Sequence, residues 1–226
     1  MTTSTTLDWT ETLAGEMLLF GLLGRAFQNY PAAEERPWLQ TLIDEDMFQE
    51  APFGASQSDV AEGLRLLQAW SRAGLSDQNF DALQNDYTRM FIGPAKVVVP
   101  PWESVYFNRE RLTFQEQTLD VRGWYRRFGL QSERLYSEPD DHIGLELAFL
   151  SHLAQRGLSA LEQGAQEEFE WIIDAQREFL DQHPRQWASA FCEGILENAA
   201  TPFYKGLALL TRGALAELAE ILHNER

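Results

Sequence analysis

The run DDHIGLELAFLSHLAQR, residues 140–156, carries apolar side chains on several faces of the helix that it predicts. These side chains are Ile143, Leu145, Leu147, Phe149, Leu150 and Leu153. A helix that is apolar on most sides is stable only when other helices surround it. We therefore expect this helix, ended by Gly157, to lie at the centre of the fold.

Helical periodicity continues on both sides of this run. Apolar residues recur at 4-3-4-3 spacing from Leu13 to Phe27, and start and stop signals divide the rest of the chain. Further helices are expected over residues 58–74, 76–91, 113–129, 161–183, 187–195 and 201–221, with Ser58, Ser76 and a Thr113–Glu116 capping box at three of the starts. The prediction is an all-α, single globular bundle of about nine to ten helices. Its N-terminal half (about 1–111) and C-terminal half (about 112–226) are expected to form one compact unit.

The charge balance narrows the classes of partner. The chain has 18 basic and 35 acidic residues and a net charge of −17. Such a surface repels phosphate backbones and attracts cationic peptides, so we expect no nucleic acid partner. A plainer alternative is that the acids only keep the protein soluble. With one cysteine, Cys192, no secretory pattern and no long apolar run, we expect a cytoplasmic protein that does not insert into membranes.

Residues 92–112 interrupt the helical pattern with Gly93-Pro94 and Pro100-Pro101. Trp102 and Tyr106 follow the second proline pair, and their rings offer large contact surfaces on a stiff loop. This arrangement suits the binding of a partner. The alternative is that the rings only fill the core beneath a long loop.

Residues 138–142, EPDDH, place three carboxylates and one histidine where a helix should begin. Acids suit the positive end of the helix dipole, whereas helix capping does not require His142. The neighbouring acids should favour the charged imidazole, so His142 is expected to titrate near neutral pH. The alternative is a helix cap with an incidental histidine. No convincing metal site appears, because the single Glu220–His223 pair lacks a second pair.

Taken together, these segments resemble the TorD/DmsD/NarJ family of redox-enzyme maturation chaperones, and its DmsD branch most. The resemblance is carried by Phe91-Ile92-Gly93-Pro94, by Pro100-Pro101-Trp102-x-Ser104-Val105-Tyr106, and by Glu138-Pro139-x-Asp141-His142. It implies an all-helical chaperone without catalytic activity. Such a chaperone binds the twin-arginine signal peptide and precursor of a molybdopterin oxidoreductase subunit, and delays export until the cofactor is inserted. Components of the Tat export machinery are further candidate partners.

The resemblance also implies where the peptide binds. The matching positions, with neighbours in the same segments, are Tyr87, Met90, Phe91, Gly93, Pro101, Trp102, Tyr106, Glu138, Asp141 and His142. We expect Asp141 and nearby acids to receive the arginines, because carboxylates pair well with guanidinium groups. No metal or other cofactor is expected, apart from weak GTP binding, to which some relatives have been linked.

Two other hypotheses stay open. One is a NarJ-type assembly chaperone that acts mainly on the folded body of a nitrate reductase-like subunit. The other, less favoured, is a nucleotide-binding or nucleotide-hydrolysing protein in which Asp141 and His142 act as an acid–base pair.

Overall fold

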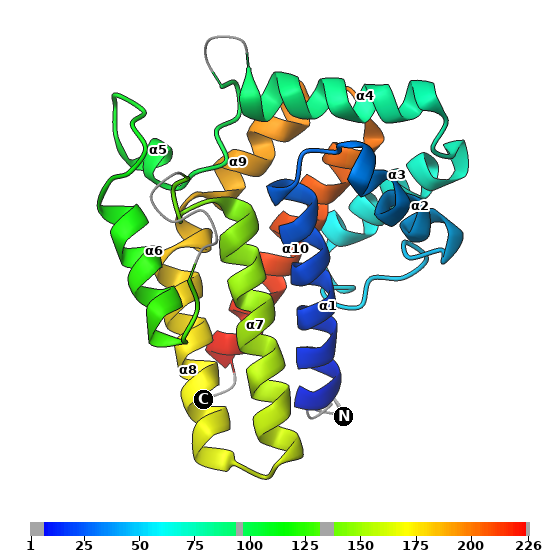
Figure 1. Ribbon diagram of the computed structural model, residues 1–226. Coiled ribbons are helices and arrows are strands. Elements are labelled where there is room, and N and C mark those ends of the chain that lie inside the picture. The colour runs from blue at the N-terminus through cyan, green and yellow to red at the C-terminus, as the bar shows by residue number, and fades with distance from the viewer. Residues whose placement is uncertain (1–6, 94–96, 132–137, 225–226) are drawn as a thin grey trace.

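The structure is a computed structural model that describes residues 7–93, 97–131 and 138–224, and within these ranges it contains ten α-helices (Figure 1). The helices are α1 (Trp9–Gln28), α2 (Arg36–Asp44), α3 (Ser58–Ala73), α4 (Asp77–Tyr87), α5 (Ser104–Phe107), α6 (Glu116–Arg127), α7 (Ile143–Glu162), α8 (Gln166–Gln182), α9 (Pro184–Asn198) and α10 (Pro202–Asn224). A short 3₁₀ turn (Ala33–Glu35) precedes α2, and a π-helical turn (Thr88–Ile92) extends α4. The predicted all-α class is confirmed.

The central helix is α7, as the sequence predicts, and it lies antiparallel to α1 (Figure 1). The two backbones approach closely where Gly24 crosses Gly144. A Cβ atom on Gly144 would lie 2.7 Å from the carbonyl oxygen of Gly24, so only glycine fits this crossing. A second close pairing joins α3 to α10, again through two glycines, Gly63 and Gly206.

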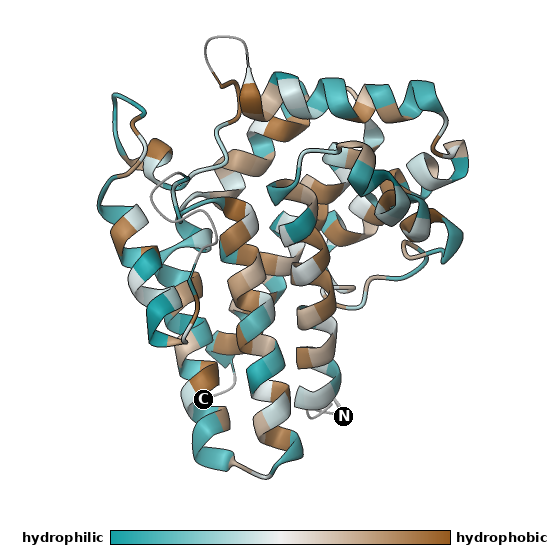
Figure 2. Cartoon of the chain, viewed as in Figure 1, coloured by the Kyte–Doolittle hydropathy of each residue, from teal (hydrophilic) through white to brown (hydrophobic). Residues whose placement is uncertain are grey.

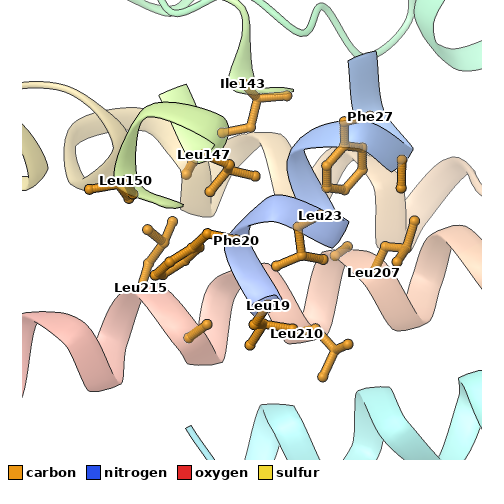
Figure 3. Close-up of a cluster of buried hydrophobic side chains, with 14 of the residues drawn as sticks. Leu19, Phe20, Leu23, Phe27, Ile143, Leu147, Leu150, Leu207, Leu210 and Leu215 are labelled. Carbon is orange, nitrogen blue, oxygen red and sulfur yellow. The ribbon is translucent and has the colours of Figure 1, made fainter. Parts of the chain in front are cut away.

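The core lies where α1 is held between α7 and α10 (Figure 3). The buried side chains in this layer are Leu19, Phe20, Leu23 and Phe27 from α1, Ile143, Leu147 and Leu150 from α7, and Leu207, Leu210 and Leu215 from α10. Hydrophobic residues line these inner helices, whereas the outward faces of α4 and α8 are mostly hydrophilic (Figure 2). This amphipathic pattern accounts for the layers of the bundle.

The ends of α7 differ from the prediction. The helix continues through Gly157 to Glu162, and the chain reverses at Gly164, whose φ is 67°. Gly157 instead makes room for α1, because a Cβ there would lie 3.2 Å from Leu13. At the other end the helix begins at Ile143, so Asp140 and Asp141 precede it and His142 is its N-cap.

Two predicted caps are wrong. The Thr113–Glu116 box does not form, because Phe114 takes a left-handed φ of 57° and Gln115 occupies the N-cap of α6. Ser58 is the first residue of α3, and Gln57 precedes it as the N-cap. Ser76 does cap α4, accepting a hydrogen bond from the backbone amide of Asn79. The sequence signals also missed α2 and the short α5.

Two further observations bear on function. None of the described helices could span a membrane.

Cys192 is buried in α9, and burial raises the pKa of its thiol to about 12. It therefore packs as an apolar side chain and is not a nucleophile.

Candidate functional site

The two segments singled out in the sequence meet in an antiparallel bridge between Trp102 and His142. The amide of Ile143 donates to the carbonyl of Pro101 over 2.8 Å, and the amide of Glu103 donates to the carbonyl of Asp141 over 2.9 Å. The stiff Pro100-Pro101 pair brings the loop alongside the start of α7. The bridge places the indole and the imidazole edge to face, with their centroids 6.0 Å apart.

His142 caps α7 in its neutral form. Its Nδ1 atom accepts a hydrogen bond of 3.0 Å from the amide of Gly144, which requires an unprotonated Nδ1. Burial lowers the pKa of His142 to about 4. The expectation of a histidine titrating near neutral pH is therefore wrong, because burial disfavours the charged imidazole.

The two aspartates before the cap face inward. Asp141 is fully buried and accepts hydrogen bonds of 2.7 Å from both the amide of Ser104 and the hydroxyl of Thr118. Asp140 is also buried, paired with the guanidinium of Arg122. Residues 97–107, which carry Trp102 and Tyr106, form a segment that we call the aromatic loop. The two carboxylates attach this loop and α6 to the start of α7. This geometry does not support the predicted contact between Asp141 and the arginines of a peptide, since no part of its side chain reaches the surface.

The same contacts bear on the hydrolase hypothesis. Asp141 directs its two oxygens to Ser104 and Thr118 instead of to the imidazole of His142. The acid–base pair that such an enzyme would need is not assembled. Among the described residues, no group of three or more histidine, cysteine, aspartate or glutamate side chains could hold a metal ion.

A pocket of about 550 Å³ opens beside the bridge, and we call it the bridge pocket. Six of the ten predicted site residues line it: Tyr87, Phe91, Pro101, Trp102, Glu138 and His142. The other described lining residues are Gln28, Asn29, Tyr30, Ala32, Glu34, Glu35, Ile92 and Val97. The pocket therefore joins the end of α1, the turn before α2, the π-helical turn, the aromatic loop and the start of α7.

The remaining four predicted residues do not line the pocket. Asp141 and Met90 are fully buried. Tyr106 packs its ring on Trp187 and donates its hydroxyl to the carbonyl of Pro100 over 3.0 Å. Gly93 ends the π-helical turn with a φ of 64°. Pro94, the last residue of the Phe-Ile-Gly-Pro motif, lies outside the described residues.

The π-helical turn shapes the aromatic wall. The amide of Gly93 donates to the carbonyl of Thr88 over 2.7 Å, which widens the last turn after α4. Phe91 then points inward, stacked on Phe191 with centroids 5.9 Å apart, while Ile92 is 51 % exposed. Tyr87 is fixed by its hydroxyl, which donates to the carbonyl of Phe27 over 3.1 Å.

The rim of the bridge pocket is acidic. Glu34 and Glu138 are exposed, and Glu35 accepts a hydrogen bond from Arg25 over 3.1 Å. Among the described lining residues, none is lysine or arginine. Glu34 and Glu35 were not among the predicted site residues. The available signal was a pair of acids in the short segment after Tyr30-Pro31, between two helices.

A buried acidic cluster lies beneath the bridge. Glu103 pairs with Nδ1 of His183 over 2.9 Å, and Glu146 accepts from the indole of Trp187 over 3.1 Å. Burial, together with the nearby carboxylates of Glu103 and Asp141, raises the pKa of Glu146 well above its ordinary range. The shift favours the protonated form of Glu146, which reduces the repulsion between these buried carboxyl groups.

Two relatives with similar sequences indicate the class of this protein. A Tat proofreading chaperone, DmsD, of Salmonella typhimurium (strain LT2) is 31 % identical over 197 residues, covering 87 % of this chain and 85 % of the relative. A chaperone protein, TorD, of Aliivibrio fischeri is 26 % identical over 177 residues, covering 78 % and 76 %. The chain is therefore a redox-enzyme maturation chaperone, and the expectation that it is not an enzyme is confirmed.

The family follows from a second match. Residues 54–193 fit the family model described as nitrate reductase delta subunit, and this chain belongs to that family, which confirms the resemblance noted in the sequence. An Archaeoglobus fulgidus protein, provisionally assigned to redox enzyme maturation, has the same fold with a TM-score of 0.51. That protein is 20 % identical, and the match covers 92 % of this chain and 93 % of the other.

Proposed function

We propose that this protein is a cytoplasmic chaperone that binds the twin-arginine signal peptide of a molybdopterin oxidoreductase subunit of the dimethyl sulfoxide reductase type. By binding the precursor it delays export until the cofactor is inserted. The observation that carries this proposal is the bridge pocket, which has an aromatic wall and an acidic rim. A leader of this kind begins with a cationic end and continues with an apolar stretch, so the two surfaces are complementary.

The acids at the rim are our candidates for the arginine contacts. Glu34 and Glu138 are exposed, and Glu35 accepts hydrogen bonds from the guanidinium of Arg25, the same chemistry that a peptide arginine would use. The aliphatic stems of the arginines would lie on Trp102 and Tyr87. Asp141 then acts as a positioning residue that holds the aromatic loop against α7.

Calorimetry with a synthetic twin-arginine leader tests the proposal. We expect the native chain to bind this peptide and to bind poorly a peptide in which both arginines are replaced by glutamine. Trp102→Ala should weaken binding by at least about tenfold, because partly buried aromatic anchors dominate such interfaces. Trp171→Ala is the matched control, since Trp171 is partly exposed on α8 and does not line the pocket. Equal affinity of all three proteins would refute the site.

A second candidate function is a NarJ-type assembly chaperone for a nitrate reductase-like subunit. The description of the matching family model favours it. A pull-down from anaerobically grown cells, followed by calorimetry with leader peptides of the recovered enzymes, distinguishes the two clients. Capture of a nitrate reductase-like subunit whose leader peptide does not bind the bridge pocket would favour this second candidate.

A further inference from the structure

A second depression, of about 610 Å³, runs along α1 and is mostly apolar. We call it the α1 groove. Its apolar lining includes Leu18 and Leu22 of α1, Trp38 and Leu42 of α2, Met47, and Leu64 of α3. Leu18 is 55 % exposed and Met47 is 42 % exposed. Contiguous apolar surface of this kind is unfavourable in water and marks a place where a partner binds.

The α1 groove and the bridge pocket are neighbours on α1. Leu18, Leu22 and Arg25 line the groove, and Asn29, which follows the helix, lines the pocket. Their spacing of four, three and four residues places them in one row. Both depressions therefore lie on the same side of α1. Helix α2 lies beside α1 (Figure 1).

An ion pair stands at the boundary between the two depressions. Arg25, from the groove, donates to Glu35, from the pocket, over 3.1 Å. Its guanidinium also lies 4.5 Å from the centroid of Trp38. The boundary thus already holds a guanidinium between a carboxylate and an indole, which is the chemistry that a twin-arginine peptide would use.

The dimensions match the second half of such a leader. The apolar part of a signal peptide has about 7–15 residues. The residues of α1 that line the groove run from Glu11 to Arg25. This stretch is about 21 Å long at the rise of an α-helix, which suits roughly fourteen residues of a docked helix. An apolar helix lying in an apolar groove is a common mode of peptide recognition.

We propose that the apolar segment that follows the twin arginines docks in the α1 groove, antiparallel to α1. This inference rests on the proposed function, which places the arginines in the bridge pocket at the C-terminal end of α1. The peptide chain then runs from Asn29 toward Leu18. Leu18, Leu22 and Met47 contact the apolar segment, and the groove sets the length of leader that the chaperone accepts.

The test uses two peptides and three proteins. One peptide is a full leader, and the other keeps the arginines but lacks the apolar segment. The proteins are the native chain, Leu18→Asp, and Leu119→Asp as a matched control. Leu119 is 62 % exposed on α6 and lines neither depression. Circular dichroism is used to check that both variants are folded. We expect that they are, because both leucines are largely exposed.

We expect Leu18→Asp to weaken binding of the full leader about tenfold and to leave binding of the shortened peptide unchanged. Leu119→Asp should bind both peptides like the native chain.

If Leu18→Asp binds the full leader like the native chain while Trp102→Ala does not, the groove assignment is overturned and the proposed function stands. If the native chain is a dimer that Leu18→Asp dissociates without loss of leader affinity, a second copy covers the groove and the inference is overturned. Failure of the native chain to bind either peptide would overturn the proposed function itself.

Discussion

Trp102 and His142 face each other across an antiparallel bridge, with their ring planes at 76°. One ring belongs to the aromatic loop and the other caps the central helix. Both rings line the bridge pocket. The shape of the pocket therefore depends on the cap of α7, and a change at the cap should be detected in peptide binding.

Two substitutions of His142 separate its two roles. Asparagine is a good N-cap and can accept the hydrogen bond from Gly144, whereas alanine cannot, so His142→Ala should cost about 1 kcal/mol of stability and His142→Asn much less. Both variants lose the ring against Trp102, and both should bind a leader peptide more weakly. Urea unfolding and calorimetry measure the two effects. Native affinity in His142→Asn would show that the ring makes no contribution.

The lowered pKa of His142 predicts a dependence of stability on pH. Between about pH 6.5 and the folded pKa of about 4, the unfolded chain binds the proton and the folded chain does not. This contribution is therefore complete above about pH 6.5 and is lost as the pH falls toward 4, on the order of 3 kcal/mol in total.

Thermal unfolding of the native chain and His142→Asn at a series of pH values measures this contribution by difference. The gap between the two stabilities should change only in the acidic part of the range. Peptide affinity should not change through His142 between about pH 7 and 8, because the imidazole is neutral throughout. A change in the stability gap near neutral pH would show that His142 titrates there instead.

Salt distinguishes the acids that contact a peptide from those that position the loop. Glu34→Gln and Glu35→Gln each remove a charge from the rim, so each should weaken leader binding severalfold and reduce its dependence on ionic strength. Asp141→Asn removes a buried acceptor that holds Ser104 and Thr118. It should lower the melting temperature and the affinity, yet leave the slope against salt unchanged.

The measurement is affinity at several salt concentrations. A smaller dependence of affinity on salt in Asp141→Asn would instead support a direct contact between Asp141 and the arginines of the peptide. If the dependence of affinity on salt is unchanged in both Glu34→Gln and Glu35→Gln, the arginines do not contact these two acids.

The sequence predicted most of the helices, although not α2 and α5, because strong local signals mark them. That the two functional segments share one site was implied by the family resemblance. The apolar faces of residues 143–153 require a central position. At the end of the helix predicted over residues 76–91, regular spacing allows either Met90 or Phe91 to face inward. The structure buries both, since the π-helical turn contains one residue more per turn than an α-helix. A pattern based on regular helical spacing cannot anticipate that extra residue.

The inward orientation of Asp141 could not be predicted in the same way. Its partners, Ser104 and Thr118, are distant in sequence, and an acid before a helix is ordinarily exposed. Glu34 and Glu35 reach the pocket only because the chain turns between α1 and α2, and periodicity does not describe that turn. Helical patterns thus predicted the scaffold, whereas the rim depends on the paths of loops.

A buried carboxyl in α1 should make the protein less stable at alkaline pH. Glu16 is fully buried and accepts a hydrogen bond of 2.6 Å from Gln176 on α8, and burial raises its pKa to about 8. The folded chain therefore binds this proton between the ordinary pKa of 4.5 and about 8, whereas the unfolded chain releases it. The contribution is complete below that range and is lost as the pH rises through it.

Glu16→Gln should remove this dependence. The loss of stability from about pH 5 to about pH 9 that is specific to Glu16 should be on the order of 4 kcal/mol in the native chain and absent in the variant. Guanidinium unfolding at both pH values measures it. A variant that loses stability with pH as steeply as the native chain would show that Glu16 is not the group responsible.

The crossing of α1 and α7 links the core to the bridge pocket, and a single methyl group tests that link. A Cβ on Gly144 would lie 2.7 Å from the carbonyl oxygen of Gly24 and 2.9 Å from the backbone of Gln28, so α1 would have to move away. Gly144→Ala should therefore cost about 2 kcal/mol, in the range observed for overpacked sites. Because Gln28 and Asn29 line the pocket, leader binding should weaken as well.

The control is Gly123→Ala in α6, where a Cβ meets nothing within 4 Å and where alanine should stabilise the helix by about 1 kcal/mol. Chemical unfolding and calorimetry on both variants give the result. Equal stability of Gly144→Ala and the native chain would mean that the two helices do not cross as closely as the structure places them.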